Sequence, residues 1–349
     1  MSRKTGLIKQ LLLDEIGADH ASPVAKVAHQ SGVSRQAVDK QLRNLIAQGV
    51  VQVEGEGKGS RYFLPVLSEK LKQYRLAEGL EEHVVWRELI LPTVAERQPS
   101  ELAVLAYGFN EMLNNAIEHS QAKQVVVRVV RNANSITLQI ADDGVGIFKK
   151  IAQAFRLSSS EEALFEVSKG KLTTEPNRHN GEGIFFTSRL FDAFMLSSNN
   201  VSFMHNAHVE DSWLAQSDSH DAAGTRVSMV LNFPAQRSVE AVFGEYVASK
   251  GEFGFTKTHV LLKLAQFGEK MLMSRSHARR VFWRLERFGC VVLDFAGVEM
   301  VGPAFIDELI RVLPAKKPKI KLSLVNLNHT IERAIARTGV SPAGGNKSG

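Results

Sequence analysis

The sequence predicts a multidomain chain of mixed α/β class, and three observations support this. A chain of 349 residues has room for two or three domains of roughly 150 residues each. Its composition, 44% hydrophobic and 23% charged, is typical of a globular protein rather than of a disordered or fibrous one. The pattern also changes along the chain: helices with a hairpin (1–65), alternating helices and strands with glycine clusters (83–235), and a smaller α/β unit (240–338).

Two segments are expected to lie outside the three folded units. Residues 66–82 are polar and lysine-rich, and we expect a linker or a bridging helix there. Residues 339–349 are rich in glycine, serine and proline and are expected to form a disordered tail.

Composition also restricts the cellular setting. No apolar run approaches the ~20 residues needed to span a bilayer, and the N-terminus does not resemble a signal peptide. We therefore expect a cytoplasmic protein without a membrane partner. The net charge of +6 with a pI of about 9.3 is compatible with a polyanion partner. Residues 1–65 hold nine Lys and Arg against six Asp and Glu.

The N-terminal unit is predicted as three helices and a β-hairpin. Apolar spacing indicates helices over 6–16 and 22–30, and Ser34 is a natural N-cap for a third. Residues 50–53 and 61–64 are expected to form two strands around a glycine-rich tip. The third helix would face the core with Val38, Leu42, Leu45 and Ile46.

This order resembles the winged helix-turn-helix domain, whose third helix reads DNA and whose hairpin is the wing. A recognition helix needs an apolar back and polar or basic residues that reach bases and phosphates. The alternative is a small protein-binding module of the same shape. The resemblance implies that DNA contacts come from Ser34, Arg35, Gln36, Lys40 and Arg43 on the helix and from Lys58 and Arg61 on the wing.

The central unit contains the strongest chemical signal. A helix is predicted over 101–120, where Glu111 and Asn115 lie four residues apart and therefore on one face. A carboxylate and an amide oxygen suit a hydrated Mg²⁺ ion. The carboxylate could also orient or deprotonate a nucleophile.

Three further motifs follow in order. Two strands, 125–130 and 135–141, are predicted to lead into an acidic, glycine-rich turn. Glycines allow the backbone to approach a ligand closely, and a pair of them before a helix N-terminus favours phosphate. A last strand is expected over 227–231. The candidate binding residues in these motifs are Asp142, Gly144, Gly146, Gly181, Gly183 and Thr225.

Together these motifs resemble the GHKL-type ATP-binding domain of histidine kinases, gyrase, Hsp90, MutL and anti-sigma serine kinases. The resemblance implies that Glu111 is the catalytic base or water-orienting residue and that Asn115 is a Mg²⁺ ligand. Asp142 would bind the adenine amine, and residues 148–180 would form a mobile ATP lid. Gly144 and Gly146 would adjoin the base, Gly181 and Gly183 the phosphates, and Thr225 would support adenine. Two alternatives are ordinary turns with surface acids, or a retained fold without nucleotide binding.

One absence in the sequence argues against a sensor histidine kinase. No helical hairpin with a phosphoacceptor histidine precedes the central unit. His83 is followed by Val84-Val85-Trp86 rather than by the acid that such kinases place beside their histidine.

The C-terminal unit resembles the STAS-like domain of anti-sigma factor antagonists. The resemblance depends on a helix over 275–288, a strand over 291–295, and a following loop and helix. It implies a surface for a protein partner. In the antagonists a phosphorylatable Ser or Thr begins the second helix, whereas here 302–305 reads Gly-Pro-Ala-Phe.

Three functions remain open at this stage. The first is a nucleotide-controlled, DNA-binding transcriptional regulator that uses ATP and Mg²⁺ and acts as a monomer or a homodimer. The second is an anti-sigma-type serine/threonine protein kinase that acts on a separate protein. The third is a slow ATPase switch in which Glu111 positions water.

Overall fold

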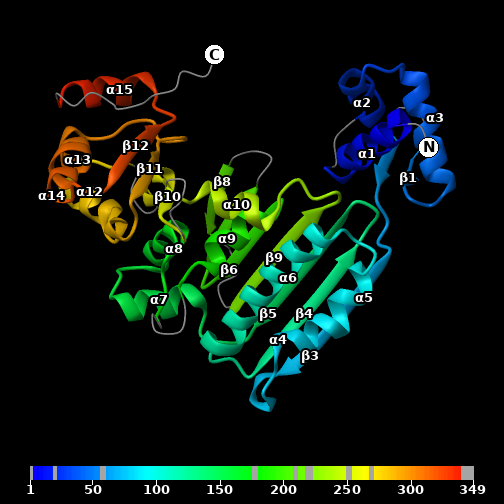
Figure 1. The fold of residues 1–349 in the computed structure, drawn as a ribbon, viewed down its shortest axis with the longest axis horizontal. Coiled ribbons are helices and arrows are strands. Elements are labelled where there is room, and N and C mark those ends of the chain that lie inside the picture. Colours follow the sequence, from blue (N-terminus) through cyan, green and yellow to red (C-terminus); the bar gives the residue numbers. More distant parts are fainter. Residues whose placement is uncertain are drawn as a thin grey trace.

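The computed structural model describes residues 3–18, 22–55, 60–174, 180–206, 211–216, 223–248, 254–266 and 271–338. A large central domain separates two small domains, which lie at opposite ends of the long axis (Figure 1). Across the described ranges, no helix is long and apolar enough to cross a membrane. The expected tail at 339–349 lies outside the described residues.

The N-terminal domain has the predicted order of three helices and a hairpin. Ser34 caps the third helix, because its side chain accepts a hydrogen bond of 3.3 Å from Ala37 N. Val38, Leu42 and Leu45 are buried, as predicted, while Ile46 is half-buried. The elements are α1 (Arg3–Gly17), α2 (Pro23–Ser31), α3 (Arg35–Ala47), β1 (Gln52–Glu54) and β2 (Arg61–Phe63).

Residues 66–82 were predicted as a linker or bridging helix, and this prediction is wrong. Strand β3 (Ser68–Arg75) pairs antiparallel with β4 and forms one edge of the large sheet. Its lysines and other polar residues are typical of an edge strand, where charge discourages pairing with another chain. That composition made the segment resemble a linker.

The central domain is built on a seven-stranded antiparallel sheet in the order β3-β4-β5-β9-β6-β7-β8. Burial alternates along its strands, so Ile136, Leu138 and Ile140 of β5 all face the core. The strands predicted over 125–130, 135–141 and 227–231 are confirmed. The remaining bounds are β4 (Gln124–Arg131), β5 (Ser135–Asp142), β6 (Ala193–Ser198), β7 (Val201–Asn206), β8 (Asp211–Gln216) and β9 (Thr225–Asn232).

Helices cover one face of this sheet (Figure 1). The longest is α6, which begins with a capping box between Gln98 and Glu101 and continues after Asn114 as a π-helical turn over Asn115–His119. A second π-helical turn, Trp86–Ile90, joins α4 to α5. The helices are α4 (Glu82–Val85), α5 (Leu91–Val94), α6 (Pro99–Asn114), α7 (Ile147–Phe155), α8 (Ser160–Lys169) and α9 (Gly183–Leu190).

The C-terminal domain holds a three-stranded parallel sheet in the order β10-β11-β12. The predicted helix over 275–288 is shorter than expected, because Arg284 takes a left-handed conformation with φ of 67° and interrupts it. A 3₁₀ turn (Leu285–Arg287) follows α12, and a π-helical turn (Glu308–Val312) joins α13 to α14. Helix α10 (Val239–Glu245) contacts α6 and α9 of the central domain. The elements of the C-terminal domain are β10 (Lys257–Leu261), α11 (Leu262–Ala265), α12 (Arg275–Phe282), β11 (Cys290–Asp294), α13 (Pro303–Asp307), α14 (Leu313–Lys316), β12 (Lys321–Val325) and α15 (His329–Ala336).

Candidate functional site

Helix α6 presents Glu111 and Asn115 to a cavity of about 400 Å³. Both side chains are half-buried, while Phe109, Met112 and Leu113 on the other side of the helix are buried in the core. The helix continues as a π-helical turn from Asn115, and such turns are frequent at functional sites. The structure therefore brings together the pair that the spacing predicted.

A second, smaller cavity of about 40 Å³ is lined in part by Asp142 and Thr225. Both cavities share part of their lining, so they adjoin one another. The shared residues are Asn115, His119, Ile147, Lys150 and Ile184. Glu111 of α6 and Asn115 directly after it therefore lie in the same region as Asp142 of β5 and Thr225 of β9. This region is bounded by α6, α7, α9 and the sheet.

Asp142 is buried at the end of β5. Its Oδ1 accepts hydrogen bonds from Gly144 N at 2.9 Å and from Thr225 N at 3.2 Å. Burial raises the pKa of this carboxyl, although the two backbone hydrogen bonds act in the opposite direction. Thr225 Oγ1 in turn accepts a hydrogen bond of 3.1 Å from Ile147 N, which fixes the start of α7 against β9.

Gly181 and Gly183 line the larger cavity, as expected for the glycine-rich motif. Gly183 is the first residue of α9, so the positive end of that helix lies at the cavity. A Cβ on Gly183 would lie 2.1 Å from Glu111 Oε2. A side chain here would therefore displace the Glu111 carboxylate from its present position.

Gly144 and Gly146 line neither of the two cavities. A Cβ on Gly144 would lie 2.1 Å from Ser120 O, and a Cβ on Gly146 would lie 2.2 Å from Asn199 Oδ1. Gly146 also has a φ of 85°. In this structure both glycines allow the β5–α7 loop to pack against the protein, and their contact with a base stays a prediction.

Lys150 is a lining residue that sequence reasoning missed. It lies in both cavity linings, and its Nζ donates a hydrogen bond of 2.8 Å to His119 O. A signal for it existed, because Ile147, Lys150 and Ile151 fall at helical spacing on one side of α7. Lys150 brings a positive charge to a site that also contains the acidic residues Glu111, Asp142 and Glu182.

Glu182 and Lys171 are two further charged residues near the larger cavity. Glu182 lines it, and burial raises the pKa of this carboxyl, partly offset by Lys171. Burial lowers the pKa of the Lys171 amine. Sequence reasoning gave no role to either residue.

The predicted Mg²⁺ ligand, Asn115, lines the larger cavity. Among the described residues, no group of three or more His, Cys, Asp or Glu side chains is placed to hold a metal ion. Mg²⁺ in nucleotide sites usually takes one or two protein oxygens together with phosphates and water. Asn115 and Glu111 both present oxygens to the cavity and fit that kind of site.

The predicted DNA-contacting residues lie far from these cavities, on α3 and the hairpin. Arg35, Gln36, Lys40 and Arg43 are exposed on one helix, although Arg43 forms an ion pair of 3.0 Å with Asp39. Arg61 is exposed on β2, and Ser34 is engaged as the helix cap. Lys58 lies outside the described residues.

Two segments of the chain match known families. Residues 85–202 match the histidine kinase-like ATPase domain, and residues 277–332 match the STAS-like domain of unknown function (DUF4325). A search of curated proteins found no match. Neither family match reaches the N-terminal domain. The chain therefore contains a histidine kinase-like ATPase domain at 85–202 and a STAS-like domain at 277–332.

Proposed function

We propose that this protein binds ATP with Mg²⁺ and is a nucleotide-controlled, DNA-binding regulator. The observation that carries the ATP proposal is the pair of adjoining cavities, one lined by Asp142 and the other by Gly183, within a histidine kinase-like ATPase domain. A buried carboxylate at one end and a helix N-terminus at the other suit a ligand with a base amine and an anionic tail.

The residues present fit the parts of a nucleotide. Asp142 is already oriented by two backbone donors to Oδ1, which leaves the carboxylate poised to accept a hydrogen bond from the adenine amine. Thr225 is held beside it by β9 and by Ile147 N. The phosphates would lie near the start of α9, where Lys150 adds positive charge.

Each polar side chain then has a definite task. Asn115 would give its amide oxygen to Mg²⁺, which would neutralise phosphate charge when bound. Glu111 would accept a proton from, or orient, a water molecule or hydroxyl placed in the cavity. The absence of a side chain at Gly183 leaves room for the Glu111 carboxylate beside the start of α9.

The DNA part of the proposal depends on charge and exposure. The exposed face of α3 carries Arg35, Gln36 and Lys40 next to a hairpin, an arrangement suited to a DNA groove. The C-terminal domain adds a larger excess: residues 254–338 contain fifteen Lys and Arg against seven Asp and Glu. The positive charge of both terminal domains therefore favours binding to a polyanion such as DNA.

A direct attachment between domains supports nucleotide control. Gln10 Nε2 of α1 donates hydrogen bonds of 2.9 Å to Asn134 Oδ1 and 2.7 Å to Phe233 O. Asn134 Nδ2 donates one of 3.0 Å to Asp14 Oδ1. The N-terminal domain thus contacts the β4–β5 turn and the end of β9, two strands that also position Asp142 and Thr225.

DNA binding under nucleotide control has a direct test. Affinity for mixed-sequence DNA would be measured over a range of salt concentrations, with and without ATP–Mg²⁺. We expect salt-sensitive binding whose strength depends on the nucleotide. No salt-sensitive affinity in either state would end the DNA proposal and leave the ATP proposal intact.

The second candidate is an enzyme, either a serine/threonine protein kinase that acts on a separate protein or a slow ATPase. The Glu111–Asn115 pair at the cavity favours it. Incubation with γ-labelled ATP separates the cases. Label on a protein supports the kinase, and free phosphate alone supports the ATPase. Nucleotide-dependent DNA binding with neither product supports the regulator.

A further inference from the structure

Helix α8 lies within 148–180, the stretch expected to form a mobile lid, yet it is buried along seven consecutive residues, Ala163–Lys169. It contacts α9 and β7 of the ATPase domain, and β10 and α11 of the C-terminal domain. One helix is therefore enclosed between two domains. Figure 1 shows α8 at this junction, below β10.

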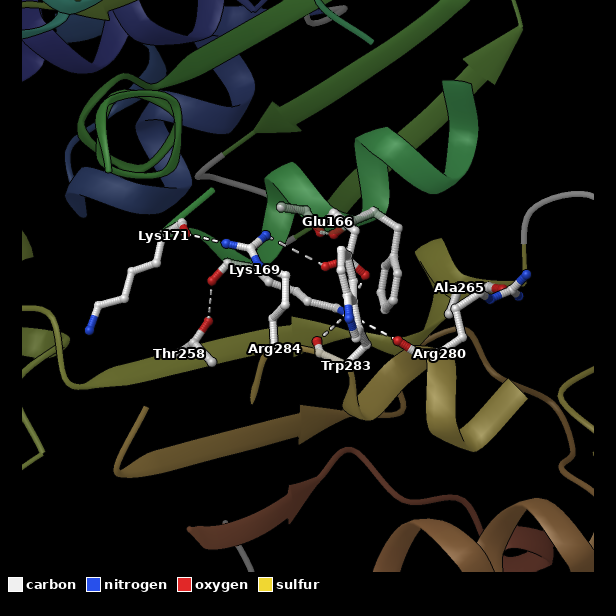
Figure 2. Close-up of polar contacts among 10 residues, drawn as sticks. Glu166, Lys169, Lys171, Thr258, Ala265, Arg280, Trp283 and Arg284 are labelled. Atoms are coloured by element: carbon white, nitrogen blue, oxygen red, sulfur yellow. Dashed lines mark hydrogen bonds and ion pairs between the residues drawn. The ribbon is translucent and has the colours of Figure 1, made fainter. Parts of the chain in front are cut away.

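Lys169 is the most unusual residue of this junction, because its side chain is only 1% exposed. A buried ammonium group is costly unless its three donors have partners. Lys169 Nζ has three: Glu166 Oε1 at 2.5 Å, Arg280 O at 3.2 Å and Trp283 O at 3.2 Å. Two of the three belong to the C-terminal domain (Figure 2).

Arg284 completes the cluster from the C-terminal side. Its Nη1 lies 3.8 Å from Glu166 Oε2, and its Nη2 donates a hydrogen bond to Lys171 O. Arg287 Nη1 donates to the same oxygen at 3.0 Å. Thr258 Oγ1 of β10 also donates to Lys169 O at 2.7 Å. The end of α8 is thus held through both side chains and main chain (Figure 2).

The directed contacts of this cluster suit it to hold α8 in one position against the C-terminal domain. Burial lowers the pKa of Lys169 and raises that of Glu166, and their mutual attraction only partly offsets both effects. Burial also lowers the pKa of Arg284 to about 10. Apolar residues often replace a buried ion pair without loss of stability, but they cannot replace directed hydrogen bonds.

The held segment leads directly into the nucleotide cavity. Val167 of α8 lines that cavity, and so do Leu172 and Thr173, which follow the cluster. Leu172 N donates a hydrogen bond of 3.2 Å to Gly181 O, part of the proposed phosphate loop. A displacement of this loop would therefore be transmitted over a few residues to Lys169.

We propose that Glu166, Lys169 and Arg284 form an ionic latch that makes α8 and the STAS-like domain move as one unit, so that this domain responds to the nucleotide site. The latch depends on the proposed ATP site, since nucleotide is what would move α8. The STAS-like domain thereby acts as the output surface for that site.

Hydrogen exchange of the full-length protein, with and without ATP–Mg²⁺, tests the latch. In the wild type, nucleotide should change exchange both around the cavity and in segment 275–288 of the C-terminal domain. In Lys169→Met the change at the cavity should remain, while the change in 275–288 is lost. ATP affinity should shift about fivefold or more in this variant, the lower range of typical coupling.

Two further variants keep the test decisive. Glu166→Gln/Lys169→Met removes the unpaired carboxylate that Lys169→Met leaves behind, and it should uncouple the domains in the same way. Lys319→Met changes an exposed lysine before β12, outside both cavities and the latch, and should behave as wild type. A wild-type response confined to the cavity would overturn the latch and leave the ATP site standing. A wild type that binds no ATP would overturn both.

Discussion

Gly183 lies against Glu111 so closely that a Cβ on the glycine would stand 2.1 Å from the Oε2 of the glutamate. This contact joins the start of α9, proposed to face phosphate, to the acid proposed to act on water or a hydroxyl. Two motifs that are 72 positions apart in the sequence therefore form one contact. The distance between Gly183 and the Glu111 carboxylate would change if the backbone of α6 or of α9 shifted.

Gly183→Ala should weaken ATP binding and disturb Glu111. The new methyl group must displace the carboxylate or the start of α9, since the contact is shorter than real Cβ contacts. Calorimetric titration with ATP–Mg²⁺ measures the effect. Gly244→Ala is a matched control in helix α10, because nothing lies within 4 Å of its Cβ position. The control should bind ATP as wild type does and gain up to about 1 kcal/mol of stability.

Asp142→Ala should abolish detectable ATP binding. The variant loses the proposed acceptor for the adenine amine and the acceptor that orders Gly144 N and Thr225 N. Removing the acceptor of a buried donor costs about 1–3 kcal/mol. Asp142→Asn retains an acceptor oxygen and should keep more of the fold's stability, measured by thermal unfolding. Full ATP affinity in Asp142→Ala would contradict the adenine assignment.

ATP affinity should fall on acidification earlier than an ordinary aspartate would predict. Burial raises the pKa of Asp142, so its ionised form is lost at a higher pH than the usual value of about 3.9. Asp142→Asn should remove this component of the pH profile. The free energy of unfolding depends on pH in the opposite direction to ATP affinity. Because the folded state binds this proton more readily than the unfolded state, the contribution of Asp142 to the free energy of unfolding rises as the pH falls.

Glu111→Gln should keep nucleotide binding and lose any turnover. Glutamine is nearly isosteric, so the contact with α9 remains, but it cannot accept a proton. Phosphate release and transfer of γ-label would be compared with wild type after equal ATP occupancy. Turnover at the wild-type rate in Glu111→Gln would remove Glu111 from the chemistry.

Arg35→Ala/Lys40→Ala should weaken DNA binding and flatten its salt dependence. Each lost phosphate contact lowers the slope of log affinity against log salt by about 0.9. Arg87→Ala, an exposed arginine on the central domain, is the matched control and should leave the slope unchanged. A double variant with an unaltered slope would argue that α3 faces protein or solvent instead.

The sequence predicted the site better than the surroundings of the site. Glu111, Asn115, Asp142 and Gly183 line the two adjoining cavities, and spacing and local glycine patterns singled them out because these reflect local geometry. Their roles stay predictions. The edge strand β3 was missed, since its solvent-facing lysines hide the alternation that identifies buried strands.

The latch could not be predicted from sequence. Glu166 and Lys169 are three apart on a helix, a spacing typical of exposed ion pairs. Their burial depends on Arg280, Trp283 and Arg284, more than a hundred residues later. Only the packing of two domains removes this lysine from water.

The central claim, that the chain binds ATP with Mg²⁺ in the cavity between α6 and α9, has one direct measurement. Thermal unfolding of the wild-type protein would be followed with and without millimolar ATP–Mg²⁺. Binding to the folded state alone stabilises it by about 2.7 kcal/mol at a ligand concentration a hundredfold above Kd. We expect a rise in Tm that is absent in Asp142→Ala. A wild-type Tm unmoved by ATP–Mg²⁺ would contradict the account.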